Sequence, residues 1–548
     1  MTRRVGLKMM KIKTCILAIF LLVMTACGTE LVSEENQGNA VVEIKLSDEM
    51  ISIDGTEAGA DSEQAVYVAN DIVYYESGKD FTYGEGTEKD AHSAEEAAAN
   101  TVVHITEPGS YHLSGKLSSG QIAVDLGEDA KKDPEAIVTL VLDNVDITCE
   151  VAPAVIFYNV YECGNDDAEQ ATKDVDTSKA GANVIIADGS ANEVHGSYVE
   201  RIYKPDSVVL NEDKTEVEDA KKLHKYDGAF YSRMSMNISG EKGNTGVLNI
   251  FAENEGLDTE MHLSINGGNI NIQSGNDGIN TNEDGVSVTT INGGNLTIKV
   301  TGETGEGDGI DSNGWLVING GSVTAYACSD SADAGIDSDM GIHINGGTVM
   351  ATGHMLDHIE EGGQTYVVFN FAQEQGGNEV VSLKNESGNA IMEISPSNAY
   401  SILVYSSAHI KEGMYTLWIE DEQLAGSSSG NMMMGGPGMM GRPGMQGVPE
   451  MPDGKEFPGG QMPGGQMPGG QIPGGTRPEG QMPEGFPEGF PEGFEGKQPP
   501  EDEGGNWKEF ENAEVSVVFS IKEGANMFNQ VGVNETTELE SVVFFYLT

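Results

Sequence analysis

Basic residues, cysteines and aromatic side chains are all scarce in this sequence of 548 residues. There are 30 Lys and Arg residues against 88 Asp and Glu residues, which gives a formal net charge of −58 at pH 7. Proteins bind nucleic acids by neutralising phosphates with Lys and Arg, so this balance excludes a nucleic-acid-binding protein. It also disfavours electrostatic docking to an anionic membrane. Aromatic residues make up 7%, so we expect a core built mainly from Ile, Val and Leu.

The five cysteines form neither a zinc-binding pattern nor a disulfide framework. Cys149 and Cys163 both lie in strand-rich sequence, and two interpretations stay open for them. They could form a disulfide bond, or they could be small buried residues. Long amphipathic helices are lacking as well, and residues 91–100 predict at most a short helical turn.

The N-terminus has the pattern of an export signal. Five basic residues precede a short apolar stretch, residues 16–23, which is too short to span a bilayer stably. Met24, Thr25 and Ala26 then precede Cys27, an arrangement that resembles a bacterial lipobox. We therefore expect residues 1–26 to be a lipoprotein signal peptide and Cys27 to be lipidated, which predicts an extracellular protein anchored to the bacterial cell membrane. An ordinary signal peptide cleaved near Ala26 is the alternative.

An internal repeat is the strongest signal in the chain. The motif Ile-Asn-Gly-Gly begins at Ile265, Ile291, Ile318 and Ile344, in steps of 26, 27 and 26 residues. Each copy has an aliphatic residue upstream, in a Gly-aliphatic-Asp/Asn element, and another aliphatic residue downstream. The upstream residues are Leu257, Ile279, Ile310 and Ile336, and the downstream residues are Ile270, Leu296, Val323 and Val349.

Three short strands in each period predict an all-β fold, a right-handed parallel β-helix (solenoid) with coils of about 26 residues. Hairpins with Asn-Gly turns are the competing interpretation. Hairpins, however, do not require the same inward residue at a fixed spacing. In a β-helix the three aliphatic positions form three buried ladders, and the stacked Asn side chains can hydrogen-bond along the axis.

The composition divides the chain into five segments. Residues 27–100 are expected to be an N-terminal tether with leading strands, and residues 101–425 the β-helix domain, in which residues 161–225 form long loops around one strand. Residues 426–511 are rich in Gly, Pro and Met, which predicts a disordered insertion. Strand-like sequence returns in residues 512–548 and is expected to close the end of the β-helix.

The repeats place acidic and amide side chains at one edge of the predicted coils. Calcium is held by six to eight oxygen ligands, which such an edge supplies, and closely spaced carboxylates require a cation or protons. Solvated turn residues are the alternative explanation. The predicted calcium ligands are Asp258, Asp277, Asn280, Asp308, Asp311, Asp337 and Asp339.

Several motifs together resemble one family, the bacterial cell-surface carbohydrate-binding β-helix lipoproteins. The motifs are Gly-Ser-Tyr-His-Leu-Ser-Gly at residues 109–115, Leu-Val-Leu-Asp-Asn-Val-Asp-Ile at 140–147, the tandem repeats, Ser-Ile-Leu-Val-Tyr-Ser at 401–406 and the Gly/Pro/Met-rich tract. The resemblance implies a pectate-lyase-like fold, bound calcium, and binding of polysaccharides such as cellulose or polygalacturonate without cleavage.

Three functions remain open at this stage: a polysaccharide-binding protein, a calcium-dependent polysaccharide lyase and a structural adhesin of the cell envelope. A lyase needs a base, and Lys299 is the single Lys or Arg between residues 255 and 347. We therefore expect no enzymatic activity. Trp315 and Tyr326 are candidate sugar-stacking residues, although either could simply pack locally. Because the chain is so acidic, binding of an acidic polysaccharide requires a local reversal of charge, which calcium can supply.

Overall fold

The computed structural model describes residues 41–428 and 515–533, and this part of the chain is nearly all β-structure. Its one α-helix, α2 (Ala94–Ala98), is a short turn capped by the Ser93 hydroxyl, as the sequence predicts. None of its helices has the length and apolar character required to cross a membrane.

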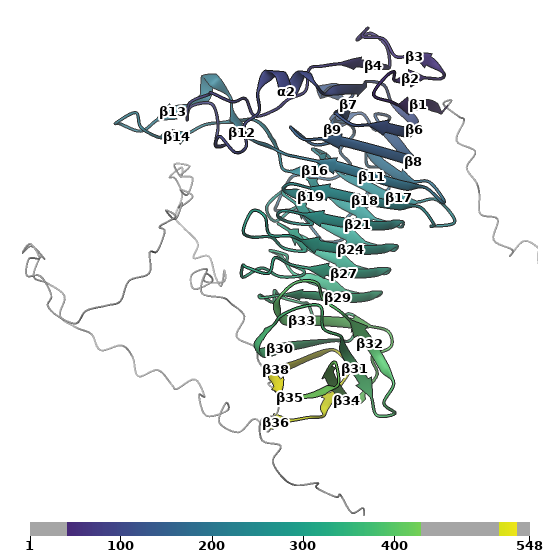
Figure 1. Cartoon of the computed structure of the whole chain (residues 1–548), viewed down its shortest axis with the longest axis vertical. Helices are drawn as coiled ribbons and strands as arrows, with labels where there is room; N and C mark the ends of the chain where they lie inside the picture. Colours follow the sequence, from purple (N-terminus) through teal and green to yellow (C-terminus); the bar gives the residue numbers. More distant parts are fainter. Residues whose placement is uncertain (1–40, 429–514, 534–548) are drawn as a thin grey trace, which may run out of the picture. The chain divides into compact units, whose positions relative to one another are not determined.

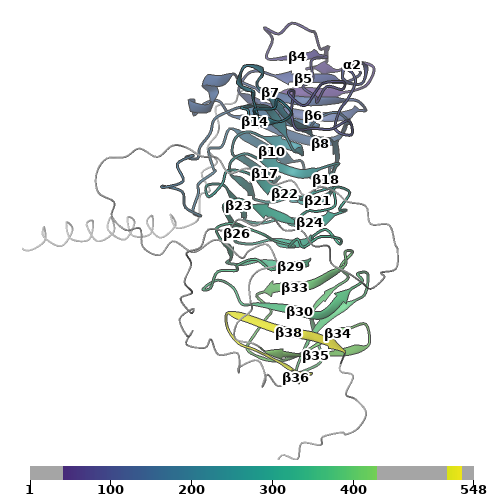
Figure 2. The same cartoon turned by 90° about the vertical axis from the view of Figure 1, so that its left-hand side faces the viewer.

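The repeats form three series of parallel strands that stack in order in Figures 1 and 2. The first series belongs to an eight-stranded sheet and comprises β16 (Gly228–Ser232), β19 (Glu255–Thr259), β22 (Ile279–Thr281) and β25 (Ile310–Ser312). The second comprises β17 (Met236–Gly240), β20 (Leu263–Ile265), β23 (Val288–Ile291), β26 (Trp315–Ile318) and β28 (Ile342–Ile344). The third comprises β18 (Val247–Ala252), β21 (Asn269–Ser274), β24 (Asn295–Val300), β27 (Ser322–Tyr326) and β29 (Thr348–Gly353).

The predicted ladders pair in register. Leu257 pairs with Ile279 and then Ile310, and the four isoleucines of the Ile-Asn-Gly-Gly motifs pair with one another. The third ladder runs from Ile270 through Leu296 and Val323 to Val349. All these residues are buried, as is Ile336, which lies outside a strand. The ladders are therefore confirmed, and each stacks like side chains in one continuous core.

The turn of each motif repeats as well. The Asn292 side chain donates to Asn266 at 2.8 Å, Asn319 donates to Asn292 at 2.9 Å, and Asn345 donates to Asn319 at 2.9 Å. The second glycine of every motif has a φ between 79 and 95°, a region that favours glycine. The expected amide ladder is confirmed.

The strands that precede the repeats extend the same sheets. They include β5 (Thr101–Ile105), β6 (Gly109–Leu117), β7 (Gly120–Asp125), β8 (Val138–Cys149), β9 (Val155–Asn159), β10 (Ala182–Ile186) and β11 (Ala191–Gly196), which pair in parallel, with the 3-10 helix η1 (Glu128–Lys132) after β7. The first strands are β1 (Val42–Leu46), β2 (Ser52–Ile53), β3 (Thr56–Glu57) and β4 (Val66–Ala69). Among these, β1 is parallel to β6, while β2, β3 and β4 pair antiparallel.

Residues 161–225 contain more structure than the expected single strand. After β10 and β11 they form antiparallel pairs of β12 (Val199–Tyr203) with β15 (Lys222–Tyr226) and of β13 (Val209–Leu210) with β14 (Val217–Asp219), and the 3-10 helix η2 (Pro205–Ser207) lies between β12 and β13. These strands were not predicted because their sequences are rich in charged residues, and exposed hairpins need few apolar residues.

The expectation of parallel coils up to residue 425 is wrong. From β29 onward the pairing becomes largely antiparallel, because β33 runs against both β29 and β30. The strands of this part are β30 (Tyr366–Gln375), β31 (Val381–Asn385), β32 (Ala390–Ile394), β33 (Tyr400–Ser407), β34 (Gly413–Ile419), β35 (Glu422–Ser428), β36 (Val515–Ser516), β37 (Phe519–Ile521) and β38 (Ala525–Val533).

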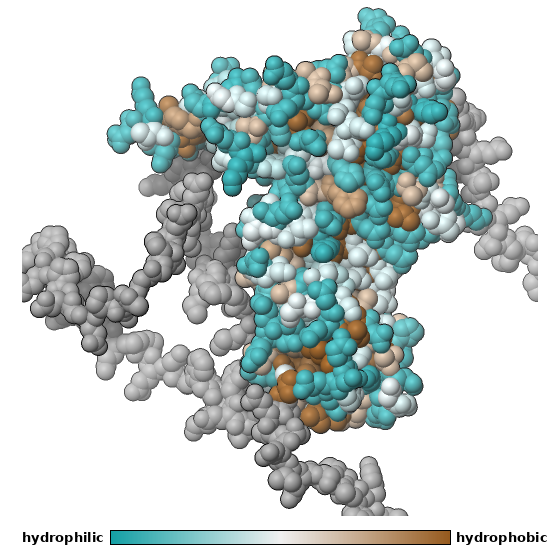
Figure 3. Space-filling model, viewed as in Figure 1, coloured by the Kyte–Doolittle hydropathy of each residue, from teal (hydrophilic) through white to brown (hydrophobic). Residues whose placement is uncertain are grey.

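These C-terminal strands have their own apolar core, which includes Phe369, Leu417, Phe519 and Phe528. Figure 3 shows a mostly hydrophilic face whose largest apolar area lies where Figure 1 places β30 and β38. The strand β38 lies between β30 and β35 and pairs with both of them. Residues 525–533 therefore complete the sheet that residues 366–428 begin. The sheets are consequently mixed rather than purely parallel.

Several expectations lie outside the described residues. They are the signal peptide 1–26, the lipidated Cys27, the tether up to residue 40, the insertion from residue 429 onward and residues 534–548 of the closing segment. Residues 426–428, which were expected to begin the insertion, end β35 instead. Among the described cysteines, Cys149, Cys163 and Cys328 are all free thiols, so Cys149 and Cys163 are not bridged.

Candidate functional site

One row of side chains links the acidic residues of successive repeats. Tyr231 of β16 pairs with Asp258 of β19, which pairs with Asn280 of β22, which in turn pairs with Asp311 of β25. Because side chains alternate between the two faces of a strand, the aliphatic neighbour of each acid points into the core. The acids therefore share the opposite face of the eight-stranded sheet.

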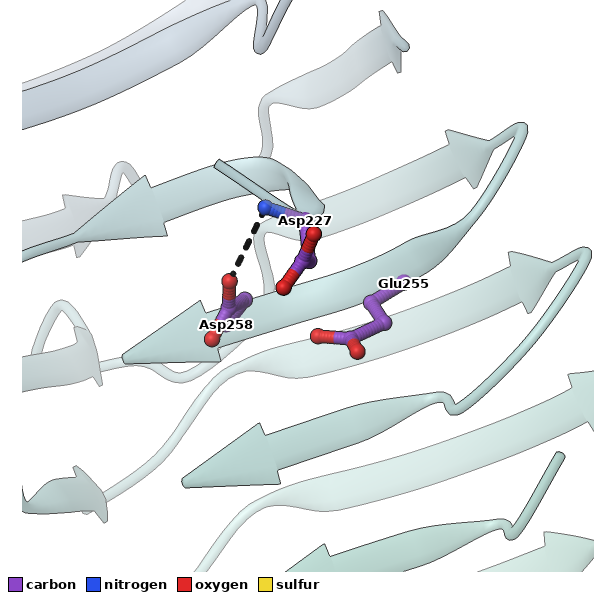
Figure 4. Close-up of side chains that lie close together, drawn as sticks. All are labelled: Asp227, Glu255 and Asp258. Atoms are coloured by element: carbon purple, nitrogen blue, oxygen red, sulfur yellow. Dashed lines mark hydrogen bonds between the residues drawn. The ribbon is translucent and has the colours of Figure 1, made fainter. Parts of the chain in front are cut away.

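Asp227, Glu255 and Asp258 form a first acidic cluster, shown in Figure 4. All three residues are buried, and each offers an oxygen within 4.8 Å of the others. The backbone N–H of Asp227 donates to Asp258 Oδ2 at 3.2 Å. The chain approaches so closely here that a Cβ at Gly228 would lie 2.6 Å from Asp258 Cβ, so only glycine fits.

Part of this charge is compensated by neighbouring groups. Lys225 Nζ lies 2.5 Å from Asp227 Oδ2, and the Asn282 side chain donates to Asp258 Oδ1 at 2.5 Å. The Asn280 side chain donates to Glu255 Oε1 at 3.1 Å. Two oxygens still lack any hydrogen-bond partner among the described residues, namely Glu255 Oε2 and Asn280 Oδ1. Buried polar atoms without partners cost free energy, so these two oxygens call for a ligand or a proton.

The electrostatics of the first cluster agree with this geometry. Burial, followed by the charges of Asp258 and Asp227, raises the pKa of Glu255 well above its ordinary value. Burial and the charge of Asp227 likewise raise the pKa of Asp258 well above its ordinary value. Both carboxyls therefore favour protonation unless a cation lies close to them.

Asp308, Asp311 and Asp337 form a second acidic cluster two strands farther along the sheet. Their ligand atoms also lie within 4.8 Å of one another, but these side chains are only partly buried. The backbone N–H of Ala334 donates to Asp308 Oδ1 at 2.5 Å. This cluster is thus the more accessible of the two.

The carboxyls of the second cluster are strongly perturbed. Burial, together with the charges of Asp277 and Asp339, raises the pKa of Asp311 to about 7. Burial and the charges of Asp357 and Asp311 raise the pKa of Asp337 to about 7. Carboxyls that remain partly protonated at neutral pH show that the neighbouring charges are not balanced within the described part of the chain.

Four of the seven predicted ligands lie in the two clusters. Asp258 belongs to the first cluster, and Asp308, Asp311 and Asp337 form the second. Asn280 contacts Glu255, while Asp277 accepts the backbone N–H of Asp308 at 2.7 Å and so supports the second cluster. Asp339 is exposed and belongs to neither trio.

Sequence reasoning did not select two members of the first cluster, Asp227 and Glu255. Glu255 stands three residues before Asp258, at the spacing that Asp308 has from Asp311, and this equivalence places it on the acidic edge although it was not among the predicted ligands. Asp227 begins a degenerate earlier copy of the repeat, Asp-Gly-Ala-Phe at residues 227–230, and it was not selected as a ligand.

The other predicted functional residues lie elsewhere. Lys299 lies on β24, in a different sheet from the acidic row, between Gln273 and Tyr326 in register. It is therefore not the base of an acidic-row active site. Trp315 is on β26, and Tyr326 of β27 packs against the C-terminal apolar core.

A groove of about 1180 Å³ opens beside the first cluster. Its walls come from β5, β7, η1, β9, β15 and the residues that follow β16 and β19. Lys225 and Glu260 border both the groove and the first cluster. Neither Trp315 nor Tyr326 lines it.

Comparisons with known proteins agree with the resemblance seen in the sequence. Residues 99–367, just under half of the chain, match the family model described as "Carbohydrate-binding domain-containing protein". Over 172 residues the chain is 33% identical to a carbohydrate-binding domain-containing protein of Acetivibrio thermocellus. That match covers 31% of this chain and 44% of the relative, so the chain spans less than half of the relative's length. The predicted resemblance to a carbohydrate-binding family is confirmed.

A solved structure, the polysaccharide lyase-like protein from C. thermocellum, is 20% identical to this chain. The match covers 57% of this chain and 90% of that structure, with a TM-score of 0.32.

Proposed function

We propose that this protein binds polysaccharide without cleaving it and holds calcium ions in its two acidic clusters. The observation that carries the proposal is the match of residues 99–367 to a carbohydrate-binding domain, in the same stretch that contains both clusters. The three parallel strand series support the finer proposal that the repeats are coils of a right-handed parallel β-helix, because each series advances by one strand per repeat.

The donor set fits calcium. Asp227, Glu255 and Asp258 would hold one ion, with the unpartnered Asn280 Oδ1 beside them. Asp308, Asp311 and Asp337 would hold another. Every donor is an oxygen, as hard divalent cations prefer, and calcium accepts six to eight of them. Three carboxylates leave coordination positions for water or for a saccharide oxygen, so bound calcium would supply positive charge on an otherwise acidic surface.

The accessible second cluster suits an acidic polysaccharide. A uronate polymer is repelled by a chain with a net charge of −58 unless the charge reverses locally. Calcium at Asp308, Asp311 and Asp337 would provide that reversal where a polymer can reach it. Cellulose, a neutral glucan, would need no such bridge.

Binding rather than catalysis is proposed because Lys299 lies in another sheet, and because Lys225, the basic residue beside the first cluster, is already paired with Asp227. We further propose that Cys27 anchors the protein to the outer side of the bacterial cell membrane, as the lipobox-like sequence indicates.

Retention on immobilised polygalacturonate and on cellulose, each with calcium and with EDTA, tests the proposal. We expect EDTA to weaken retention on polygalacturonate at least tenfold, because the bridging cation is removed, and to leave retention on cellulose unchanged. Failure to retain either polysaccharide would refute polysaccharide binding, and retention on polygalacturonate that EDTA does not change would refute the role of calcium.

A further inference from the structure

The groove beside the first cluster differs in charge from the rest of the chain. Its lining includes five Lys or Arg residues and seven Asp or Glu residues, whereas the chain as a whole has 30 against 88. The five basic residues are Lys131, Lys132, Lys222, Lys225 and Arg233. Basic side chains are therefore concentrated at this one place.

Most of these cations already have an acidic partner. Lys222 Nζ lies 2.8 Å from Glu260 Oε1, Lys225 pairs with Asp227, and Lys131 Nζ lies 3.5 Å from Glu128 Oε2. Arg233 forms no ion pair with a carboxylate of the described residues. It donates one long hydrogen bond, 3.5 Å, to Asn159 Oδ1. A guanidinium has five N–H donors, so Arg233 retains donors for a group that enters the groove.

Aromatic side chains form the wall next to Arg233. The ring centroids of Tyr158 and Tyr226 are 5.5 Å apart, and those of Tyr226 and Tyr231 are 5.0 Å apart. His224 Nδ1 lies 2.6 Å from the Tyr226 hydroxyl. Tyr226 and Tyr231 are buried and hold the wall in place, while Tyr158 and His224 are partly exposed. These two rings offer apolar faces to a ligand.

We propose that this groove binds one uronate unit directly, with the sugar carboxylate on Arg233 and the C–H face of the ring against Tyr158 and His224. A planar guanidinium pairs with a carboxylate through two parallel hydrogen bonds, which a neutral sugar cannot form. The site needs no metal ion, because Arg233 itself supplies the positive charge. The inference rests on the proposed function in taking the ligand to be a saccharide.

The position of the groove lets one polymer reach both kinds of site. Tyr231, in the groove, pairs in register with Asp258, and the row continues through Asn280 to Asp311. Neighbouring strands are about 4.8 Å apart, so three strand steps separate Tyr231 from Asp311 by roughly 14 Å. At this separation one polymer is long enough to contact Arg233 and the second cluster together, passing outside the buried Asp258 and Asn280.

Titration calorimetry of the full-length mature chain with digalacturonate, in EDTA, tests the groove apart from calcium. We expect Arg233→Gln to bind at least about tenfold more weakly than the unaltered protein, because a charge-assisted bidentate pair is lost. Lys299→Gln, which removes a cation outside the groove, should bind equally well. The methyl ester of digalacturonate should bind the unaltered protein at least about tenfold more weakly than the acid.

Equal affinity of the unaltered protein for the acid and the ester would overturn the proposal, whether or not Arg233→Gln folds. So would equal affinity of the folded Arg233→Gln variant, or a lack of digalacturonate binding in EDTA. Polymer retention separates the two ideas. If retention stays sensitive to EDTA while Arg233→Gln has no effect on the dimer, the groove proposal alone fails. If Arg233→Gln weakens binding of digalacturonate but EDTA does not change retention of the protein on the polymer, the calcium proposal alone fails.

Discussion

Replacing Asp311 by asparagine should stabilise the protein without calcium, and calcium should reduce that gain. The pKa of Asp311 is raised from an ordinary 3.8 to about 7, so the folded protein keeps this proton at a pH where the unfolded chain has lost it. The stability gained from the proton is complete below about pH 4 and is lost as the pH rises towards 7. Asparagine does not ionise, so the variant does not lose this stability as the pH rises.

The size of the effect follows from the shift in the pKa. About three units correspond to roughly 4 kcal/mol for a fully buried group. Asp311 is partly exposed, and screening by water lowers this to about 1–3 kcal/mol. In EDTA near pH 7.5 the variant should therefore melt a few degrees above the unaltered protein, at about 2–4 °C per kcal/mol. Near pH 5 the difference should shrink, because Asp311 is then protonated in the folded protein.

Calcium should reduce this gain in stability or cancel it. The ion stabilises the folded state in proportion to its affinity, and asparagine replaces one of three carboxylates. A tenfold weaker site lowers the stabilisation by saturating calcium by about 1.4 kcal/mol. Calorimetric melts with EDTA and with calcium, at both pH values, measure the effect. Asp421→Asn, an exposed acid between β34 and β35, is the matched control. Equal melting temperatures of the Asp311 variant and the unaltered protein in EDTA near pH 7.5 would refute the electrostatic argument.

Three further substitutions test other parts of the structure. Glu255→Gln removes a buried charge whose Oε2 has no partner, so it should lower the number of calcium ions bound in equilibrium dialysis; an unchanged number would exclude Glu255 as a ligand. Ile298→Ala creates a cavity between Ile272 and Ala325 and should cost about 2–5 kcal/mol in urea unfolding, and a cost below about 1 kcal/mol would show loose packing. Asn292→Ala breaks two links of the exposed amide ladder and should cost about 1 kcal/mol in the same assay; a cost like that of Ile298→Ala would contradict its exposure.

The repeat region was predictable because its information is local. Each coil repeats the same turn and the same inward aliphatic residues, so the spacing alone determined which residues pair, down to Ile265 with Ile291. The switch to antiparallel pairing after β29 was not predictable in the same way. Alternating apolar residues in 366–419 identify strands, but they do not reveal the direction in which a strand pairs.

The candidate site was predicted in part for the same reason. Asp308, Asp311 and Asp337 occupy repeat positions, and the structure brings them together. The role of Asp227 and the basic residues of the groove were not predicted, because they depend on long-range folding. Lys131, Lys225 and Arg233 come from separate segments that have no common spacing in the sequence. Only the packing of β15 and η1 around the eight-stranded sheet makes them neighbours.

The two proposed means of reversing charge act on different ligands. Arg233 holds one carboxylate at a fixed place, so its contribution is the same for a dimer and for a polymer. Calcium at the second cluster contacts a unit roughly 14 Å away along the row, so it contributes only when the ligand is long enough to span both. Linking two weak contacts in one ligand makes the second contact intramolecular and raises the affinity of polymers selectively. Removing calcium should therefore convert a binder that prefers long uronate chains into one that binds short and long chains alike. Neutral glucans gain from neither charge, and because Tyr226 and Tyr231 are buried, contacts with the partly exposed rings of the groove, such as those of Tyr158 and His224, are what remains for them.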